Sequence, residues 1–275
     1  MFNRLSFLPV QQMLWQTGCV ADVTVRKELG MCRGSVFGPF RELLRKRVPI
    51  LSGYSQHVLP RPADCDALNH VTGFWFLDPP ADWEPPADLV DFIGAGEPPV
   101  YIGFGSMGNR NPEQTTRLVL EALTLSGQRG ILASGWGGLS QTDLPSTVHM
   151  VKSVPHSWLF PQMAAVVHHG CAGTTAAGLR AGVPSILTPF FGDQPFWGKR
   201  VAELGVGTAP ISRKRLTAEK LAQVITQAVS DIGMRQRAAD LGNNIRAEDG
   251  AKQAASLIRQ LTEKVRSDNA DTGKR

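Results

Sequence analysis

A loop between two predicted elements carries the side chains best suited to bind an anion. His169 can donate one hydrogen bond and the hydroxyl of Thr174 another. Gly170 and Gly173 let a ligand approach the backbone closely, and a helix predicted to begin near Ala172 leaves its first amides without partners. The positive end of the helix dipole adds to these donors. The loop therefore predicts a site for a diphosphate.

A second polar pair follows the next predicted strand. Asp193 and Gln194 stand in the loop after the apolar run 184–188, and ligands of open parallel sheets bind at the carboxyl ends of the strands. A carboxylate beside a carboxamide suits sugar hydroxyls, which both donate and accept hydrogen bonds. Trp197, close by in the sequence, is expected to pack rather than to form a platform for a sugar. The two loops together predict a nucleotide-sugar site.

The elements that must position these loops alternate between strand and helix. Short apolar runs predict strands at 100–104, 130–134, 147–151, 164–167 and 184–188. Besides the helix from residue 172, helical patterns lie at 112–126, 157–162, 194–204, 217–230 and 248–264. This alternation predicts an α/β fold: a Rossmann-like parallel sheet with helices on both faces.

The rest of the chain differs in composition from this alternating part. Residues 59–98 are rich in proline, which favours extended backbone and ends helices, so we expect a linker there. Residues 1–58 mix helical patches, such as 40–47, with irregular segments. The last residues, 265–275, are polar and predict a disordered tail.

The overall composition is that of an ordinary soluble protein, with 42% hydrophobic and 19% charged residues among 275. No apolar run is long enough to span a bilayer, and the start of the chain predicts a helix rather than a signal peptide. The four cysteines have no paired spacing and are expected to be reduced. These features predict a cytoplasmic protein.

The net charge of +5 comes from clusters that usually form solvated faces. Peripheral contact with an anionic membrane is the weaker interpretation. Basic residues are not interleaved with aromatic ones as they are in nucleic-acid interfaces, so no nucleic-acid partner is expected.

Two other ligand classes, zinc and a nicotinamide cofactor, fit these residues less well. His168, His169 and Cys171 could suggest zinc, but adjacent residues on a turn rarely converge on one point, so no metal is expected. The segment GFGSMG, at 103–108, matches a dinucleotide fingerprint. The next predicted strand runs into Gly135 and Trp136 rather than an acidic residue, which disfavours a nicotinamide cofactor.

Several motifs in order resemble the UDP-glycosyltransferases. The string HHGCAGTT is followed by FFGDQPFWG and RVAELGVGTAP, and VTGFWFLDP and GFGSMG precede it. The pattern is most similar to the sterol 3-beta-glucosyltransferases and to bacterial antibiotic and glycolipid glycosyltransferases. It covers roughly two hundred residues, so chance matching is not a serious rival.

The resemblance implies roles for individual residues. The diphosphate of the donor would meet Ser106, His169, Gly170, Ala172, Gly173 and Thr174. The nucleoside would lie against Ser153, Val154 and His156. The sugar would be held by Asp193 and Gln194.

The sequence departs from the family at two positions. Cys171 stands where many relatives have glycine, and Ala177 stands where plant relatives have a glutamate that binds the ribose. The second departure puts the ribose contact in doubt. A structural role is also open for two histidines: His168 is expected to be a strand-end residue, and His156 could equally begin a helix.

The resemblance also implies a domain organisation of the GT-B type. Residues 99–264 would be the C-terminal nucleotide-sugar-binding domain, 59–98 an interdomain linker, and 1–58 a remnant of the N-terminal, acceptor-binding domain. The general base of the family lies near the start of that first domain, and no histidine here stands in a matching context. The catalytic base is therefore left unassigned.

The implied function is that of a UDP-dependent hexosyltransferase. It would transfer a hexose, with glucose expected, from a UDP-sugar to a hydroxyl of a lipid, sterol or other small hydrophobic acceptor, with inversion. The UDP-sugar is a co-substrate, and no cofactor is expected. The alternative is a non-catalytic nucleotide-sugar-binding module, a truncated or split enzyme half that needs an acceptor-binding partner chain.

Overall fold

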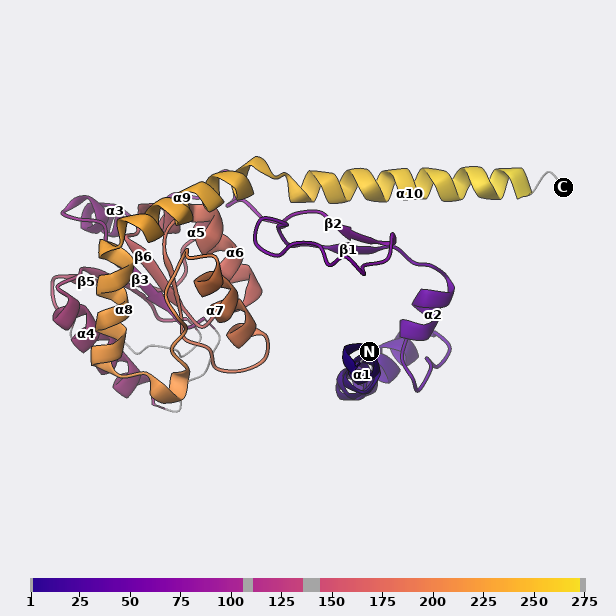
Figure 1. The fold of residues 1–275 in the computed structure, drawn as a ribbon, viewed down its shortest axis with the longest axis horizontal. Helices are drawn as coiled ribbons and strands as arrows, with labels where there is room; N and C mark the ends of the chain where they lie inside the picture. The colour runs from indigo at the N-terminus through magenta and orange to yellow at the C-terminus, as the bar shows by residue number, and fades with distance from the viewer. Residues whose placement is uncertain (1, 106–110, 136–143, 273–275) are drawn as a thin grey trace. The chain divides into compact units, whose positions relative to one another are not determined.

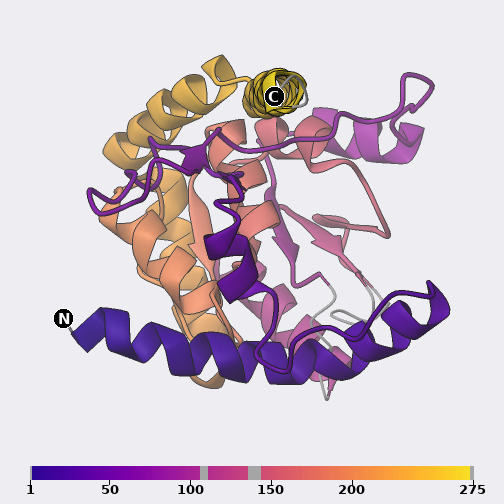
Figure 2. The ribbon, with the colours of Figure 1, turned by 90° about the vertical axis from the view of Figure 1, so that its right-hand side faces the viewer.

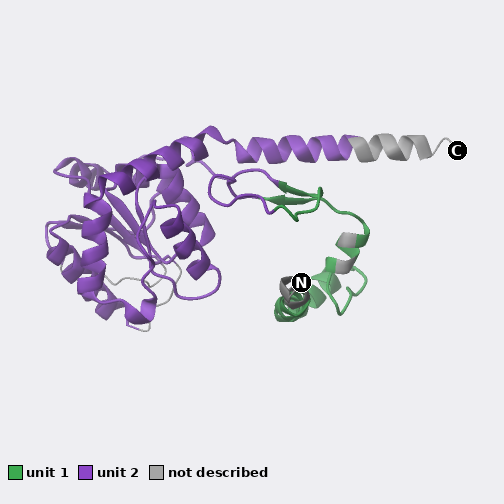
Figure 3. Cartoon of the chain, in the orientation of Figure 1, with its two compact units in different colours: residues 1–52, 63–70 green, residues 53–62, 71–275 purple. Residues whose placement is uncertain are grey.

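A computed structural model describes residues 2–105, 111–135 and 144–272. The chain divides into two compact units (Figure 3). Unit 1 comprises Met1–Ser52 and Ala63–His70, and unit 2 comprises Gly53–Pro62 and Val71–Arg275. The predicted domain boundaries near residues 58, 98 and 264 stay predictions.

Unit 1 begins with the helix predicted at the start of the chain. Trp15 of this helix lies edge-on to Phe40, with 6.4 Å between the ring centroids. One turn apart on the same helix, Asp22 and Arg26 form an ion pair of 2.9 Å, a spacing that supports helices. The elements are α1 (Phe2–Glu28), α2 (Phe40–Arg45) and a two-stranded sheet of β1 (Ile50–Ser52) and β2 (Asn69–Val71), the last residue of which is counted with unit 2.

Unit 2 contains a five-stranded parallel sheet in the order β5-β4-β3-β6-β7 (Figure 1). Its strands are β3 (Val100–Gly103), β4 (Gly130–Ala133), β5 (Val148–Val151), β6 (Ala165–His168) and β7 (Ser185–Leu187). Its helices are α3 (Ala87–Gly94), α4 (Pro112–Ser126), α5 (His156–Leu159), α6 (Ala172–Ala181), α7 (Gln194–Glu203), α8 (Ala218–Ser230), α9 (Ile232–Ala247) and α10 (Gly250–Thr272), with 3₁₀ turns at η1 (Phe160–Gln162) and η2 (Arg213–Arg215). The predicted α/β class is confirmed.

Alternate residues of each buried strand pack against helices on opposite faces of the sheet. Val100 and Ile102 of β3 join a core with α4 and α8, while Tyr101 joins another with α3, α5 and η1. Figure 1 shows α4 and α8 on one side of the strands and α5 and α6 on the other, and Figure 2 shows α3 and α8 on opposite sides. Both faces are therefore covered, which explains why the strands read as continuous apolar runs.

The order of the strands places a switch point between β3 and β6. The chain runs outward from β3 through β4 to β5 and then returns to place β6 on the other side of β3. Gly103 at the end of β3 is in register with His168 at the end of β6. Ligands of doubly wound sheets bind at such a point, so the fold brings the histidine loop to the expected place.

Helix ends show how local sequence sets these elements. Asn111 caps α4 by accepting a hydrogen bond from the amide of Gln114 at 3.1 Å, and Pro112 occupies the first turn. Asp231 caps α9 in the same way at 2.8 Å. In contrast, Cys171 precedes α6 and makes no such bond. Helix α6 therefore begins without a capping hydrogen bond from the side chain of Cys171.

Three α-helices, as well as the strands β1 and β2, differ from the sequence prediction. Helix α9 was not predicted because Gly233 and Gly242 weaken its helical pattern, and α3 lies inside the proline-rich segment, beginning directly after Pro86. Helix α10 continues past the expected end at residue 264 into the predicted disordered tail, since no glycine or proline interrupts it there. None of the helices in the described part of the chain combines the length and apolar character that crossing a bilayer requires.

Candidate functional site

The loop between β6 and α6 is shaped by a glycine in the left-handed region. Gly170 has φ +95°, and a Cβ there would come within 2.9 Å of Leu187. Its amide donates to Nδ1 of His168 at 3.1 Å. His168 is fully buried, which supports the expected structural role. The turn therefore places His169 at the edge of the sheet.

His169 is nearly buried, with 5% of its surface exposed. Its Nδ1 has no hydrogen-bond partner among the residues the structure describes. A Cβ on Gly105, whose φ is +60°, would lie 2.9 Å from Cε1 of this imidazole. The ring thus packs against the glycine that follows β3. Buried polar atoms are normally paired, so the free Nδ1 marks a place for a partner.

The first turn of α6 leaves backbone donors open. Its first helical hydrogen bond runs from the amide of Thr175 to the carbonyl of Cys171 at 2.9 Å, so the amides before it have no partner within the helix. Ala172 and Gly173 are exposed, and no atom of the described residues lies within 4 Å of a Cβ built on Gly173. An anion can reach these amides, and the helix dipole favours it.

The two predicted sugar-binding residues begin α7. Asp193 is exposed and its Oδ2 accepts a hydrogen bond from the indole of Trp197 at 2.9 Å. Gln194 is buried, and its Oε1 accepts from the amides of Phe190 at 2.7 Å and Phe191 at 3.3 Å. Gln194 therefore holds the loop in shape, whereas Asp193 presents a carboxylate at the surface.

These loops lie next to one another. A Cβ on Gly170 would be 3.4 Å from Cβ of Gln194, so the turn after β6 packs on the start of α7. The structure thus brings His169 and Gly170 together with Gln194. Ser106, predicted to lie near the diphosphate, falls outside the described residues.

The predicted nucleoside-binding residues line one small cavity of about 310 Å³. His156 stacks on Phe160 with 4.3 Å between the ring centroids, and burial lowers the pKa of His156. Its imidazole is therefore held neutral and fixed. The cavity lies at the carboxyl ends of β3, β4 and β5, and its walls include Tyr101, Gly105, Lys152, Ser153, Val154 and His156.

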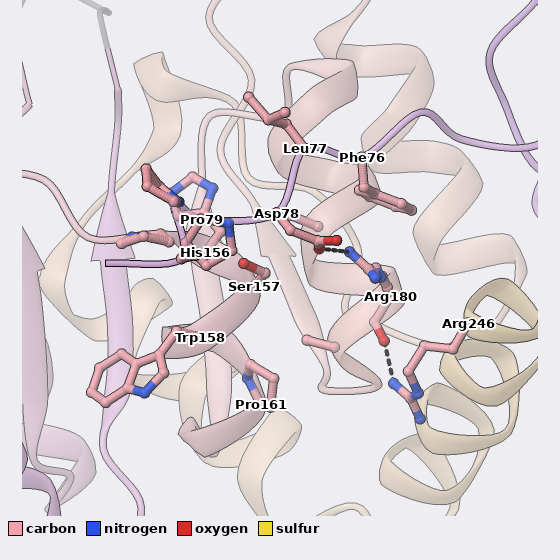
Figure 4. Close-up of a pocket in the computed structure, with 15 residues that line it drawn as sticks. Phe76, Leu77, Asp78, Pro79, His156, Ser157, Trp158, Pro161, Arg180 and Arg246 are labelled. Atoms are coloured by element: carbon pink, nitrogen blue, oxygen red, sulfur yellow. Dashed lines mark hydrogen bonds and ion pairs between the residues drawn. The ribbon is translucent and has the colours of Figure 1, made fainter. Parts of the chain in front are cut away.

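His156 also contributes to the wall of a larger cavity of about 850 Å³ (Figure 4). Along α6 this cavity is lined by Ala177 and Arg180. Arg180 pairs with Asp78 at 3.8 Å and lies 4.4 Å from the centre of the Phe76 ring. Ala177 thus presents a methyl group to this cavity at the position of the plant glutamate, and the doubt about a ribose contact there stays a prediction.

Two residues of the site carry roles that the sequence did not reveal. Tyr101 lines the small cavity, and its ring lies 5.9 Å from that of His156 in an edge-to-face arrangement. Trp197 packs in the core, as expected, but it also orients Asp193. The sequence signal for this contact is the spacing of four residues between Asp193 and Trp197, which places both side chains on one face of a helix. Within the described residues, no group of three His, Cys, Asp or Glu side chains is placed to hold a metal ion.

The burial of His168 predicts a dependence of stability on pH. Burial, with smaller effects of His169 and His156, lowers the pKa of His168 to about 3, while an unfolded histidine titrates near pH 6.5. The unfolded chain therefore binds more protons between these values, and the free energy of unfolding should fall by about 1.4 kcal/mol per pH unit as pH decreases through this window. Denaturant unfolding at a series of pH values measures the slope.

The matched variant for this prediction is His168→Gln, which keeps an acceptor for the amide of Gly170. Its free energy of unfolding should depend less steeply on pH between 3 and 6.5 than that of the parent. Equal slopes in the two proteins would show that His168 is not responsible.

Comparison with known proteins agrees with the motifs. Residues 137–261 match the family described as Erythromycin biosynthesis protein CIII-like, C-terminal domain. The chain is 46% identical over 258 residues to Sterol 3-beta-glucosyltransferase UGT80A2 of Arabidopsis thaliana, covering 93% of this chain and 40% of that protein. It is 42% identical over 270 residues to a Sterol 3-beta-glucosyltransferase of Aspergillus fumigatus, covering 94% of this chain and 19% of that protein.

Solved structures show the same fold. The glycotransferase of kitacinnamycin aligns with a TM-score of 0.69 at 23% identity, over 94% of this chain and 66% of that one. CalG4, the calicheamicin glycosyltransferase, aligns with a TM-score of 0.67 at 19% identity, over 92% of this chain and 65% of that one. The predicted GT-B fold and the resemblance to the glycosyltransferases are confirmed. The chain spans about two fifths of the length of its Arabidopsis relatives.

Proposed function

We propose that this chain supplies the donor-binding half of a UDP-dependent glycosyltransferase, which transfers a hexose to a lipid or sterol hydroxyl. One observation carries the proposal. At the switch point of the sheet, the Nδ1 of His169, which has no partner among the described residues, lies beside the open amides at the start of α6. The names of the relatives, sterol 3-beta-glucosyltransferases, support glucose as the sugar and a sterol as the acceptor.

The diphosphate of UDP-glucose is assigned to this meeting point. His169 would donate to one phosphate oxygen, and the amides of Ala172 and Gly173 to others, with Gly170 and Thr174 completing the turn. When the glycosidic bond breaks, negative charge grows on the leaving diphosphate. Donors already aimed at that charge stabilise the transition state more than the ground state, which is how they would accelerate transfer. Ser106 is assigned to the same group from the motif alone.

The sugar and the nucleoside are assigned to the loops on either side. Asp193 and Gln194 would hold the sugar hydroxyls. The Oε1 of Gln194 also holds the preceding loop, and the indole of Trp197 holds the carboxylate of Asp193. The uridine is assigned to the cavity of about 310 Å³ beside Ser153, Val154 and His156. This proposal needs no metal or other cofactor, and it leaves the general base unassigned.

The remaining partners follow from the same proposal. The acceptor is a small lipophilic molecule with a free hydroxyl, and the enzyme acts in the cytoplasm. Nucleic acid is not among the proposed partners. The proposal assigns no site to the acceptor within the described residues.

Transfer of radiolabelled glucose from UDP-glucose to a sterol tests the function. The purified chain is incubated with both substrates, and donor binding is measured in parallel by calorimetry. The proposal predicts saturable donor binding and labelled steryl glucoside, either from the chain alone or after an acceptor-binding partner chain is added. Donor binding without transfer under both conditions would favour the non-catalytic module, and no donor binding would contradict both.

Trp197→Phe tests how Asp193 is positioned. Phenylalanine keeps the buried ring but loses the N–H that donates to Oδ2 of Asp193. We expect the affinity for UDP-glucose to fall about fivefold, because one hydrogen bond contributes about 1 kcal/mol, while the affinity for UDP stays the same. Calorimetry with the two ligands measures both. The neighbouring exposed ring offers a control, Phe196→Leu, and an equal loss in this control would remove the specific role of Trp197.

A further inference from the structure

A free thiol stands directly beside the proposed diphosphate site. Cys171 is the one cysteine in the sequence of unit 2, and it occupies the position before α6 where a capping Ser, Thr, Asp or Asn is usual. It is half-buried and unbridged. Its Sγ lies 3.1 Å from Oγ1 of Thr174. The thiol is thus held close to the exposed residues Ala172 and Gly173.

A second feature, the imidazole of the preceding residue, lies near this thiol. The imidazole of His169 is 95% buried, and its Nδ1 lacks a partner in the described parts of the chain. One edge of the ring faces Gly105, where an added Cβ would lie 3.5 Å from Nδ1, and the ring lies near enough to the thiol of Cys171 to lower its pKa. An unpaired buried donor or acceptor is costly unless a ligand satisfies it. The thiol therefore lies in a place already prepared for a polar group.

The surroundings of Cys171 favour its thiolate. Burial raises the pKa of this thiol, but hydrogen bonds from His169 and Thr174 outweigh burial and bring the pKa down to about 7. The N-terminus of α6 acts in the same direction. Two further titratable groups lie nearby: His168, which its low pKa keeps neutral, and Tyr101, whose pKa burial raises so that it stays protonated. Neither introduces a competing negative charge at neutral pH.

We propose that Cys171 is a site of reversible thiolation by a small peptide disulfide of the glutathione type, and that the adduct closes the diphosphate site. The blocking effect rests on the proposed function, whereas the reactivity of the thiol does not. The thiolate attacks one sulfur of the disulfide, forming a new S–S bond to Cys171. The original S–S bond breaks, and its electron pair leaves with the second peptide as a thiolate that takes a proton from water.

The chemistry of the adduct explains why it would exclude the donor. Glutathione carries carboxylates, and these would meet the same open amides of Ala172 and Gly173 that are assigned to the phosphates. The attached peptide would also occupy the space beside Gly173, where no described residue lies within 4 Å of an added Cβ. Donor and modification therefore compete, and excess reduced glutathione reverses the adduct by the same exchange.

Glutathione disulfide is the probe that tests this proposal on the full chain. Peptide mapping by mass spectrometry follows modification of each cysteine at pH 6, 7 and 8, and calorimetry follows the affinity for UDP. At pH 7 Cys171 should react about fivefold faster than the exposed Cys32, despite its partial burial, because its surroundings favour the reactive thiolate. Saturating UDP should slow this reaction, and the modified chain should bind UDP at least tenfold more weakly until reduced glutathione restores it.

Two variants separate the possible results. Cys171→Ser should bind UDP as the parent does and lose the response to glutathione disulfide, while Cys32→Ser should keep that response. The proposal is overturned if Cys171 reacts no faster than Cys32, or if the modified chain binds UDP with the parent affinity. If the untreated parent does not bind UDP, the proposed function fails, and the relative rates at the two cysteines still decide whether Cys171 is a thiolation site.

Discussion

Replacement of His169 by alanine is expected to weaken the binding of both UDP and UDP-glucose by roughly 10- to 100-fold. The imidazole is assigned to the diphosphate, which the two ligands share, and a hydrogen bond to a charged group contributes roughly 1.5–3 kcal/mol. In the parent, the Nδ1 of His169 has no other partner among the described residues, so the imidazole can give its full hydrogen bond to the diphosphate. Alanine removes that bond entirely. Calorimetric titration with each ligand gives the two affinities.

The matched control for this change is His57→Ala, which removes a histidine whose side chain is half exposed. This control should bind both ligands like the parent. Because the ring of His169 packs against Gly105, thermal unfolding must first show that the alanine variant is folded. A folded His169→Ala chain with parent affinity for UDP would remove His169 from the diphosphate site.

Replacement of Asp193 by alanine should discriminate between the two ligands. Its carboxylate is assigned to the sugar hydroxyls, so the affinity for UDP-glucose should fall by roughly 10- to 100-fold, whereas UDP, which has no sugar to hold, should bind as before. The same titrations measure the ratio of the two affinities. A fall of similar size for both ligands would place Asp193 at the diphosphate instead.

Asp193→Asn is the informative companion of this variant. Asparagine can still accept the hydrogen bond that Trp197 donates, so the start of α7 keeps its shape while the negative charge is lost. An intermediate affinity for UDP-glucose is expected. If the Asn and Ala variants lose the same affinity for UDP-glucose, the negative charge carries the interaction. If the Asn variant binds UDP-glucose like the parent, only the hydrogen-bond acceptor matters.

The fold was largely predictable because its strands are buried on both faces. The short apolar runs that became β3 to β7 had no other stable environment than the inside of a parallel sheet. Helix α9 escaped prediction, although Met234, Ala238, Leu241 and Ile245 are buried at helical spacing. Its Gly242 weakens the helix, yet a Cβ there would lie only 2.6 Å from Cα of Gly182. The close packing of α9 on Gly182 therefore requires glycine at position 242, although glycine has a low helix propensity.

The site was predictable in its loops but not in its contacts. The motifs led to the turn at His169 and to the Asp193–Gln194 pair, and parallel strands bring such loops to one edge. The burial of Gln194 and its bonds to the amides of Phe190 and Phe191 depend on how two loops meet in space. No pattern along the chain encodes that meeting. The contribution of Tyr101 to the small cavity was hidden for the same reason.

A crystal structure of the chain with UDP tests the central assignment most directly. We predict phosphate oxygens within hydrogen-bonding distance of the His169 imidazole and of the backbone amides of Ala172 and Gly173, with the uracil in the cavity beside Val154. A nucleotide bound elsewhere on unit 2, or one whose diphosphate points away from the start of α6, would contradict the assignment.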